Sequence, residues 1–458
     1  MKKHWKRLCT ATLALIFTLA LAGCAGGNKS PLNPKAPVTL TMWHNFGGTM
    51  QETMDELIDE FNSTVGREQG IVINVTAISS SAELQKTLAM IAAGDPGAPE
   101  MPNITTSYPK TAILFQQKGM LADLDEYFTQ EEMAGYIPSF VEEGRFEDGL
   151  YVFPIAKSTE ILYLNQTLFD QFAAATGVTM DSLATFEGLA DAAQKYYDWT
   201  DAKTPDVPDD GKSFYVADSW LNLSQAGMMQ QGASLFENEA LNLDSDAYAR
   251  IWNTLCPPML TGAFANYEGY SSDLSKTGDI VCSTGSSAGI LFYGDTITYK
   301  DGRVEQVEYS ILPFPVFEGG EKLAIQRGNG MMVAKGDEAH EYASAVFLRW
   351  FTAPEQNMRF IASTGYLPVT QDAFENRMGP EIEQVEDYRI KKMLVAVTEM
   401  YENYEFFVAP TFEAFDSLSG AYEKDFKAFM ATQREQWLAS EASPEEQSAA
   451  ALQQWRSR

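Results

Sequence analysis

The chain has 458 residues, of which 63 are acidic and 33 are basic, so its formal net charge is −30 at pH 7. A chain this acidic is a poor candidate for binding nucleic acid or an anionic membrane surface. Its length exceeds what one hydrophobic core normally serves, so we expect two or more lobes.

The first 24 residues have the order of an export signal. Four Lys and Arg residues precede a mostly apolar run from Leu8 to Leu21, which small residues then follow. This order is typical of a secretory signal peptide, and the run is short for a bilayer span of about 20 residues. The ending Leu21-Ala22-Gly23-Cys24 resembles the lipobox of bacterial lipoproteins. The resemblance implies cleavage after residue 23 and lipidation of Cys24, whereas an ordinary cleaved signal with an incidental Cys24 is the alternative.

The next segments predict a tether and the start of an α/β body. Residues 24–37 are rich in Gly, Asn, Ser, Pro and Lys without periodicity, which favours a flexible tether. Residues 38–42 alternate as a strand, and an amphipathic helix follows with its apolar face through Met50 and Phe61. A second strand at 71–75 and a second helix at 82–93 repeat the order. Strand and helix in alternation predict an α/β fold with parallel pairing.

The remaining elements continue this mixed pattern. Past Cys24 the sequence has no apolar stretch long enough to span a membrane. Beyond Gly336 the pattern is mainly helical. The other predicted segments are helices at 109–118, 166–175, 186–197 and 246–255, strands at 150–153, 161–164, 279–282, 309–312 and 324–334, and an exposed loop at 198–212.

Two cysteines, Cys256 and Cys282, lie beyond Cys24. Outside the cytoplasm a disulfide between them could persist, but their spacing neither requires nor excludes it, so pairing stays open. His44 and His340 stand alone, without a Cys-x-x-Cys pair or a His-rich tract. We therefore expect no metal site and no cofactor.

Several stretches, in this order, resemble the extracellular solute-binding proteins of carbohydrate-type ABC importers, the family 1 or maltose-binding-like group. They are Val38 to His44 with the helix ending Glu60-Phe61-Asn62, Leu88 to Pro96, Ser158 to Asn165, Lys335-Gly336, Pro354-Glu355, and Thr364-Gly365-Tyr366-Leu367-Pro368. The resemblance implies two α/β lobes that close on a ligand in the cleft between them, a helical C-terminal region, and docking on ABC permease transmembrane subunits. We place the signal peptide at 1–23, lobe 1 at 38–155 with about 295–350, and lobe 2 at 156–294 with about 351–458. We expect a monomer outside the cytoplasm, anchored to the cell membrane only through lipid on Cys24.

The resemblance also suggests which residues contact the ligand. Trp220 stands where family members carry tryptophans in the cleft. Core packing is the alternative for Trp43, simple packing for Tyr108, and a solvated charge for Glu160. Ser81 stands where the glycerol-phosphate-binding branch carries a Tyr, so an aromatic contact is lost there. Glycine inside a strand allows close approach of a ligand to the backbone. The full predicted set is Trp43, His44, Ser81, Tyr108, Ser158, Glu160, Trp220, Ser286, Ser287, Gly328, Asn329 and Tyr366.

Within this family the sequence most resembles the glycerol-3-phosphate-binding branch, but the resemblance is incomplete. Members of that branch hold the phosphate with a C-terminal Arg, but the comparable segment Tyr401 to Phe407 contains none. Phosphate recognition favours Arg or Lys in a pre-organised fork. We therefore favour a neutral sugar or oligosaccharide, with glycerol 3-phosphate or a glycerophosphodiester as the alternative.

An enzyme is the main rival from another class. Gly285-Ser286-Ser287-Ala288-Gly289 matches the nucleophile-elbow pattern after a predicted strand, and Asp295 or Asp337 with His340 would complete the order Ser, Asp, His. His340, however, lies in a charged stretch that opens a helix, which favours an exposed residue. We expect a binding protein rather than a secreted serine hydrolase using Ser287. A purely structural surface lipoprotein is a third hypothesis, and it would have a filled cleft.

Overall fold

The computed structural model describes residues 30–147, 149–412 and 414–458. The signal peptide, Cys24 and the first part of the predicted tether lie outside the described residues. Leu32 packs against the core, and the Ala36 amide donates a 2.9 Å hydrogen bond to the Asn33 carbonyl. The last residues of the predicted tether therefore belong to the folded body, which corrects its expected end at residue 37.

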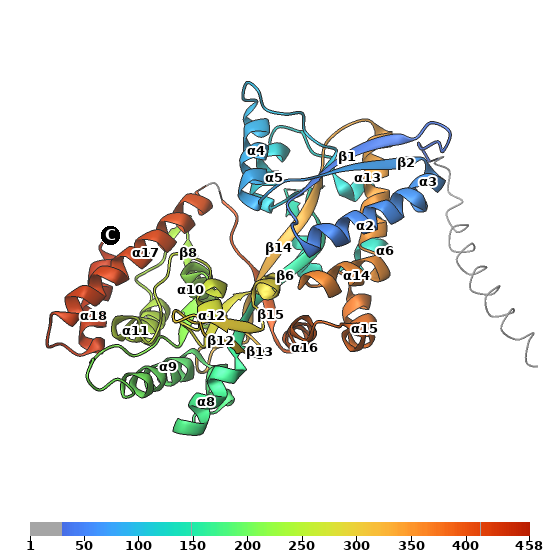
Figure 1. Ribbon diagram of the computed structural model, residues 1–458. Coiled ribbons are helices and arrows are strands. Elements are labelled where there is room, and N and C mark those ends of the chain that lie inside the picture. Colours follow the sequence, from blue (N-terminus) through green and yellow to red (C-terminus); the bar gives the residue numbers. More distant parts are fainter. Residues whose placement is uncertain (1–29, 148, 413) are drawn as a thin grey trace, which may run out of the picture.

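One continuous sheet runs through both lobes, and its long central strands connect them (Figure 1). β1 pairs in parallel with β2 and β3, as the strand–helix alternation predicts. The strand order is β2 (Ile71–Ala77), β1 (Val38–His44), β3 (Ile104–Ser107), β14 (Leu323–Val333), β6 (Phe153–Asn165), β10 (Cys282–Ser286) and β7 (Tyr215–Ala217), with β13 (Tyr309–Leu312) on β6 and β15 (Glu405–Val408) on β14.

Strand β6 is the main connection between the lobes. Its residues Phe153 to Thr159 pair with β14 of lobe 1, and its residues Glu160 to Leu164 pair with β10 of lobe 2. The sequence predicts two separate strands here, but one strand spans the whole stretch. All its side chains are buried, because the lobes cover both faces, so no polar turn interrupts it.

Helices cover the sheet in each lobe. In lobe 1, α2 buries Met54, Leu57, Ile58 and Phe61 along one face, as the spacing predicts. Lobe 1 contains α2 (Thr49–Ser63), α3 (Val65–Gln69), α4 (Ser81–Ala93), α5 (Pro109–Gln116), α6 (Gln130–Met133), α7 (Pro138–Glu142), α13 (Glu338–Phe351), α14 (Pro354–Thr364) and α15 (Met378–Gln384). Short strands β4 (Arg145–Phe146) and β5 (Gly149–Leu150) form a small hairpin there.

Lobe 2 is built around α10 and α11, on which the C-terminal helices pack. Its helices are α8 (Gln166–Thr176), α9 (Phe186–Asp201), α10 (Trp220–Gln230), α11 (Asp246–Thr261), α12 (Ser271–Thr277), α17 (Phe415–Leu438) and α18 (Pro444–Arg456). α16 (Tyr388–Asn403) lies beside β13, and the small strand pairs are β8 (Phe236–Glu237) with β9 (Ala240–Leu241) and β11 (Thr296–Thr298) with β12 (Val304–Gln306).

Two expected lobe boundaries need correction. β13 pairs with Leu162 to Asn165 of β6, so residues 309–312 belong to lobe 2 rather than lobe 1. α14 packs on α2, so residues 354–364 belong to lobe 1 rather than lobe 2. The chain therefore returns to lobe 1 along β14, later than the sequence pattern suggests.

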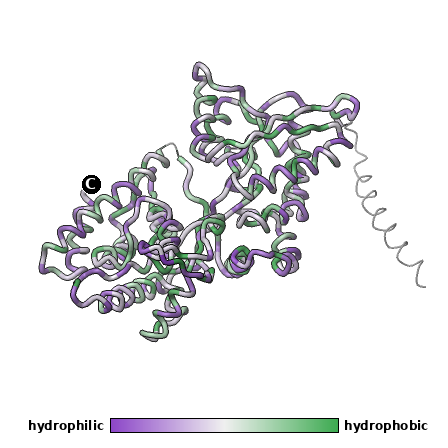
Figure 2. The backbone as a smooth tube through the Cα atoms, in the orientation of Figure 1, coloured by the Kyte–Doolittle hydropathy of each residue, from purple (hydrophilic) through white to green (hydrophobic). Residues whose placement is uncertain are grey.

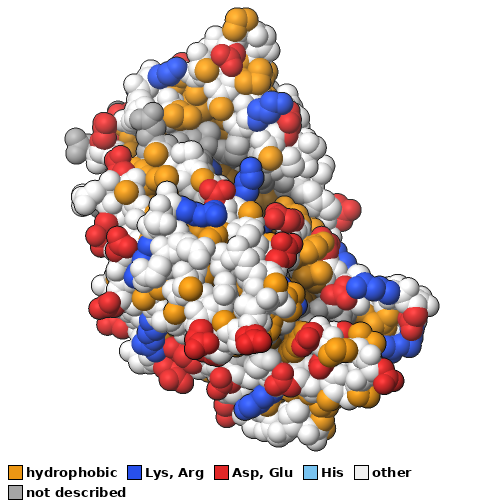
Figure 3. Space-filling view, turned by 90° about the vertical axis from the view of Figure 1, so that its left-hand side faces the viewer, with side chains coloured by type: hydrophobic (Ala, Val, Ile, Leu, Met, Phe, Trp, Pro, Cys, Tyr) orange, Lys and Arg blue, Asp and Glu red, His pale blue; other side chains and the backbone are white. Residues whose placement is uncertain are grey.

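The core is one large apolar cluster that follows the central strands through both lobes (Figure 2). A smaller cluster lies under α4 and α5 and includes Leu84, Leu88 and Phe115. Within the described ranges, none of the helices has the length and apolar character needed to cross a membrane. On the face shown in Figure 3, basic side chains lie singly or in small groups among acidic ones.

Candidate functional site

Two adjoining cavities lie between the lobes, one on each side of Arg327. The first compartment has a volume of about 440 Å³ and the second about 400 Å³. They share Ser286, Ala288, Arg327 and Tyr366. Lobe 1, lobe 2 and the crossing strands all contribute to the walls, so a ligand in this cleft would contact both lobes at once.

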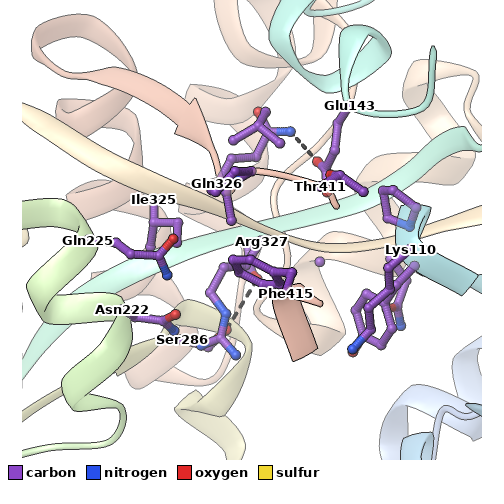
Figure 4. A pocket seen from close by; sticks show the side chains of 18 of the residues that line it. Lys110, Glu143, Asn222, Gln225, Ser286, Ile325, Gln326, Arg327, Thr411 and Phe415 are labelled. Carbon is purple, nitrogen blue, oxygen red and sulfur yellow. Dashed lines mark hydrogen bonds between the residues drawn. The ribbon is translucent and has the colours of Figure 1, made fainter. Parts of the chain in front are cut away.

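The first compartment is lined by both polar and apolar side chains (Figure 4). Asn222, Gln225 and Ser286 of lobe 2 lie on one side of Arg327, and Lys110 and Glu143 of lobe 1 lie on the other. Its other lining residues are Tyr108, Pro109, Ser158, Leu221, Ala288, Ile325, Gln326, Gly328, Asn329, Tyr366, Val408, Ala409, Pro410, Thr411 and Phe415.

The floor of the first compartment is formed where β14 crosses β6. Gly328 has a φ of +104°, and a Cβ atom there would lie 2.7 Å from the Cα atom of Lys157. Only glycine allows the two backbones to approach this closely. The close crossing presents Ser158 and Asn329 to the cleft, and Ser286 donates a 3.2 Å hydrogen bond to the Ser158 hydroxyl.

An ion pair lies at the junction of the compartments. Arg327 Nη1 lies 2.6 Å from Glu160 Oε1, and Asn222 Nδ2 donates to the same oxygen at 3.0 Å. The Glu160 side chain is 3% exposed, whereas Arg327 is 39% exposed. Burial raises the pKa of the Glu160 carboxyl, Arg327 opposes this shift, and the negative charge of Asp218 reinforces it. The carboxylate therefore sits behind the guanidinium, which faces the cleft.

A second ion pair lies at the lobe 1 wall. Lys157 Nζ is 2.8 Å from Glu143 Oε2, and the Lys157 side chain is almost completely buried. Gln326 donates hydrogen bonds from Nε2 to Glu143 and, at 3.2 Å, to the Ser139 carbonyl oxygen. Glu143 is thus held by two partners, and its charge is compensated inside the protein.

Gln225 is a buried amide without a partner at the edge of the first compartment. Its side chain is 3% exposed, and neither its Oε1 nor its Nε2 has a hydrogen-bond partner among the described residues. An unsatisfied buried amide costs free energy. The start of α10 is fixed by Glu423, which accepts from the Leu221 amide at 2.9 Å. The unsatisfied amide of Gln225 therefore lies on a helix that is held in place and faces the cleft.

Aromatic rings line both compartments. Tyr366 lies parallel to Phe360, with an interplanar angle of 13°, and meets Phe46 edge-on at 6.1 Å between centroids. The second compartment has Tyr163 and Tyr293 stacked at 3.9 Å, and Tyr270 at its rim with 73% exposure. Aromatic faces with nearby hydroxyl and carboxylate groups suit a ligand that has both apolar and hydrogen-bonding faces.

The structure brings six of the predicted residues into the lining of the cleft, namely Tyr108, Ser158, Ser286, Gly328, Asn329 and Tyr366. Ser81 does not line the cleft itself, but its hydroxyl donates a 3.5 Å hydrogen bond to the hydroxyl of Tyr108, which does. Glu160 also lies behind the surface, where it holds Arg327. These two contribute to the site through another residue.

Four predicted residues do not line either compartment. Trp43 packs against the apolar cluster under α4 and α5, and Trp220 is buried against Phe264 and Phe426. His44 is fully buried, and burial lowers the pKa of its imidazole. Ser287 is also fully buried, and its hydroxyl accepts a 3.4 Å hydrogen bond from the Thr159 amide. Both tryptophans therefore pack against apolar neighbours rather than lining the cleft.

Sequence reasoning missed Arg327, Gln225, Lys110, Glu143 and the segment 408–411. Arg327 had a usable signal, since it is the basic residue beside Gly328 in the interrupted strand. No sequence signal marks Gln225 as a site residue, because it lies within an ordinary helix. Segment 408–411 reaches the cleft only through the parallel pairing of β15 with β14, a long-range contact.

The arrangement does not support the hydrolase hypothesis. Ser287 has no imidazole beside it in the cleft lining, because His44 is in the core and His340 lies on α13. His340 Nδ1 lies 2.8 Å from Asp337, a residue that caps the same helix. In the described part of the chain, no cluster of three His, Cys, Asp or Glu residues has metal-binding geometry. Cys256 and Cys282 are both buried free thiols, so the disulfide that the sequence left open is not formed.

The comparisons with known proteins agree with this geometry. Residues 56–389 match the family described as bacterial extracellular solute-binding protein. A relative in Rhizobium meliloti (strain 1021), the sn-glycerol-3-phosphate-binding periplasmic protein UgpB, is 24% identical over 366 residues, or 74% of this chain and 77% of the relative.

Solved structures share the fold. The cyclic alpha-maltosyl-1,6-maltose binding protein from Arthrobacter globiformis has a TM-score of 0.68 and 20% identity, covering 91% of this chain and 98% of that one. UgpB from Mycobacterium tuberculosis in complex with glycerophosphocholine has a TM-score of 0.63 and 16% identity, covering 92% and 98%. Both the two-lobed fold and the family match extend over most of the chain, and the chain therefore belongs to the bacterial extracellular solute-binding proteins.

Proposed function

We propose that the protein captures a neutral sugar or oligosaccharide in the cleft between its lobes and delivers it to an ABC permease. The observation that carries this proposal is the chemistry of the cleft. Hydroxyl and amide groups line the first compartment, and hydroxyl groups line the second. Tyr108 and Tyr366 offer ring faces, and the two carboxylates Glu143 and Glu160 compensate basic side chains. Neutral polar ligands with hydroxyl groups fit such a surface.

Lobe closure is the mechanism. Lys110 and Tyr108 belong to lobe 1, whereas Asn222 and Gln225 belong to lobe 2. A ligand that contacts both groups stabilises the closed arrangement over the open one, by as much as its contacts differ between the two. β6 and β14 connect the lobes as continuous strands, so bending where they cross lets the lobes move without breaking either lobe.

Glycerol 3-phosphate or a glycerophosphodiester is the second candidate. Its support is the relatives, several of which are named as glycerol-3-phosphate-binding proteins. Arg327 and Lys110 are basic residues that line the first compartment. Against it stands the pairing of Arg327 with Glu160, which removes the net charge that phosphate recognition favours.

We further propose that the protein is a monomer outside the cytoplasm, held at the membrane by lipid on Cys24. A tether near a permease raises the effective concentration of the binding protein there. One acyl chain gives only weak, reversible membrane binding, so two or more are needed for stable anchoring. The lipid would serve transport without contacting the ligand.

A thermal-shift screen followed by calorimetric titration tests the proposal. The mature protein is screened against maltose, mannotriose, glycerol 3-phosphate and glycerophosphocholine, and the Tyr366→Ala variant serves as a control with an impaired cleft. We expect a stabilising shift with a neutral sugar that Tyr366→Ala reduces, and a smaller radius of gyration in small-angle scattering. Binding of the phosphate esters alone would favour the second candidate, and an absence of binding to all sugars and esters would contradict both.

A further inference from the structure

Arg327 is the charged residue among the four that both compartments share. Its guanidinium carries five N–H donors in a planar fork. Nη1 is engaged by Glu160 at 2.6 Å, and the side chain remains 39% exposed toward the cleft. The part of the fork that is turned away from Glu160 is therefore available to ligand oxygens in either compartment.

The carboxylate of Glu160 is placed to offset the positive charge of the Arg327 guanidinium. Its side chain is 3% exposed, and it is not part of the cleft surface itself. Asn222 Nδ2 donates to Glu160 Oε1 at 3.0 Å, and Asn222 lies on α10, whose first turn is fixed by Glu423. A buried carboxylate at this distance from a guanidinium cancels its formal charge locally.

Lys110 is a second basic residue in the lining of the first compartment, but the charged side chains closest to the Arg327–Glu160 pair add no positive charge. Glu143 is held by Lys157 at 2.8 Å, so that pair is also neutral. Asp218 lines the second compartment and adds a negative charge on the same side as Glu160. A phosphate ester that approaches Arg327 therefore encounters carboxylates behind and beside the guanidinium, whereas a hydroxyl group needs only a donor.

We propose that Glu160 is a specificity-determining residue, which neutralises Arg327 so that the cleft accepts hydroxyl-rich neutral ligands and discriminates against phosphate esters. The inference rests on the proposed function and adds the residue responsible for the choice of ligand. Arg327 then serves as a hydrogen-bond donor rather than as an anion-binding cation. Glu160 acts through Arg327, so it is a positioning and charge-setting group rather than a contact residue.

The test is the substitution Glu160→Gln, which keeps the shape of the side chain and removes its charge. We expect the affinity for glycerol 3-phosphate to rise by about tenfold or more, because the Arg327 guanidinium can then form charge-assisted hydrogen bonds with the phosphate oxygens. The double variant Glu160→Gln with Arg327→Gln should lose this gain. Glu60→Gln, which breaks the surface ion pair with Arg359, makes the same charge change away from the cleft and should leave both affinities unchanged.

The outcomes separate this inference from the proposed function. If the wild-type protein binds a neutral sugar and Glu160→Gln gains no affinity for glycerol 3-phosphate, the inference is wrong and the proposed function stands. If the wild-type protein binds no sugar, the proposed function is wrong. Should Glu160→Gln fail to fold, wild-type titrations in low and high NaCl decide the matter. Tight, salt-sensitive binding of glycerol 3-phosphate by the wild type overturns the inference, and weaker binding than that of the sugar supports it.

Discussion

A Cβ atom added to Gly328 would lie 2.6 Å from the carbonyl oxygen of Ala156 on the neighbouring strand. This contact is far shorter than ordinary van der Waals contact, and the φ of +104° is also unfavourable for any side chain. The two strands carry the connection between the lobes and the floor of the cleft. Gly328 is therefore needed for the stability of the fold and for the shape of the site.

The substitution Gly328→Ala should lower the free energy of unfolding by about 1–3 kcal/mol. The measurement is urea unfolding followed by circular dichroism. Gly302→Ala is the matched control, since Gly302 also has a positive φ, +83°, but no atom lies within 4 Å of its added Cβ. The difference between the two variants isolates the backbone contact. Equal losses at the two positions would mean that the close strand crossing contributes nothing.

Gln225→Met should make the unliganded protein more stable and the ligand complex weaker. The buried Gln225 amide has no partner among the described residues, so removing it relieves a cost of about 1 kcal/mol. The same change removes a hydrogen-bonding group from the cleft, so the affinity for a neutral sugar should fall by about tenfold. Chemical unfolding and calorimetric titration of the same preparation measure the two effects.

The neighbouring Gln230 provides the control, since it lies on the same helix and is equally buried. Its Nε2 donates to the carbonyl oxygens of Pro315 and Leu323, and its Oε1 accepts from the Phe317 amide at 2.9 Å. Gln230→Met leaves these groups unpaired and should cost about 1–3 kcal/mol of stability. A loss of stability of the same size in Gln225→Met would show that its amide is satisfied in solution.

Much of the fold is encoded in local patterns that the sequence displays. The alternation of Leu40 and Met42 in β1 and the apolar face of α2 both correspond to buried residues, because each element covers one face of the sheet. The end of α4 at Gly94, which has a φ of +72°, is equally local. These features depend on neighbours within a few residues of each other.

The predictions that differ from the structure concern features that depend on long-range packing. α11 continues through Pro257 and Pro258 to Thr261, beyond its predicted end, and Pro258, Met259 and Leu260 are buried there. The lobe assignment of β13 depends on pairing with β6, which no local pattern reveals. For the site, Trp43 and Trp220 look the same in sequence whether they face a ligand or a core. Only their apolar surroundings distinguish the two cases.

His44 should make stability depend on pH below neutrality. Burial lowers the pKa of its imidazole below the usual value of 6.5, with Asp55 opposing this shift. Below about pH 6.5 the unfolded chain binds a proton that the folded protein resists, so the free energy of unfolding falls as the pH falls through this range. Urea unfolding at pH 7.5 and 5.5 should show a smaller difference for His44→Asn than for the wild type. His340→Gln, at an exposed position on α13, is the control, and an equal reduction in both variants would argue against His44.

The two buried cysteines should resist thiol reagents in the folded protein. Burial raises the pKa of both the Cys256 and the Cys282 thiol, which lowers the fraction of reactive thiolate. A chain that begins after Cys24 should therefore release little colour from DTNB until guanidinium unfolds it, when both thiols react without prior reduction. A requirement for reductant would reveal a disulfide that the structure lacks.

Replacement of Cys24 should separate anchoring from ligand binding. Cys24 lies outside the described residues, and all the described residues that line the cleft come after β1. Cys24→Ser should release the protein from membranes into the soluble fraction, while its affinity for the ligand changes less than about twofold. Cys9→Ser, inside the segment that we propose is removed as a signal peptide, is the matched control and should leave the protein on the membrane. Release without Cys24, combined with an altered affinity, would mean that the tether contributes to the binding site.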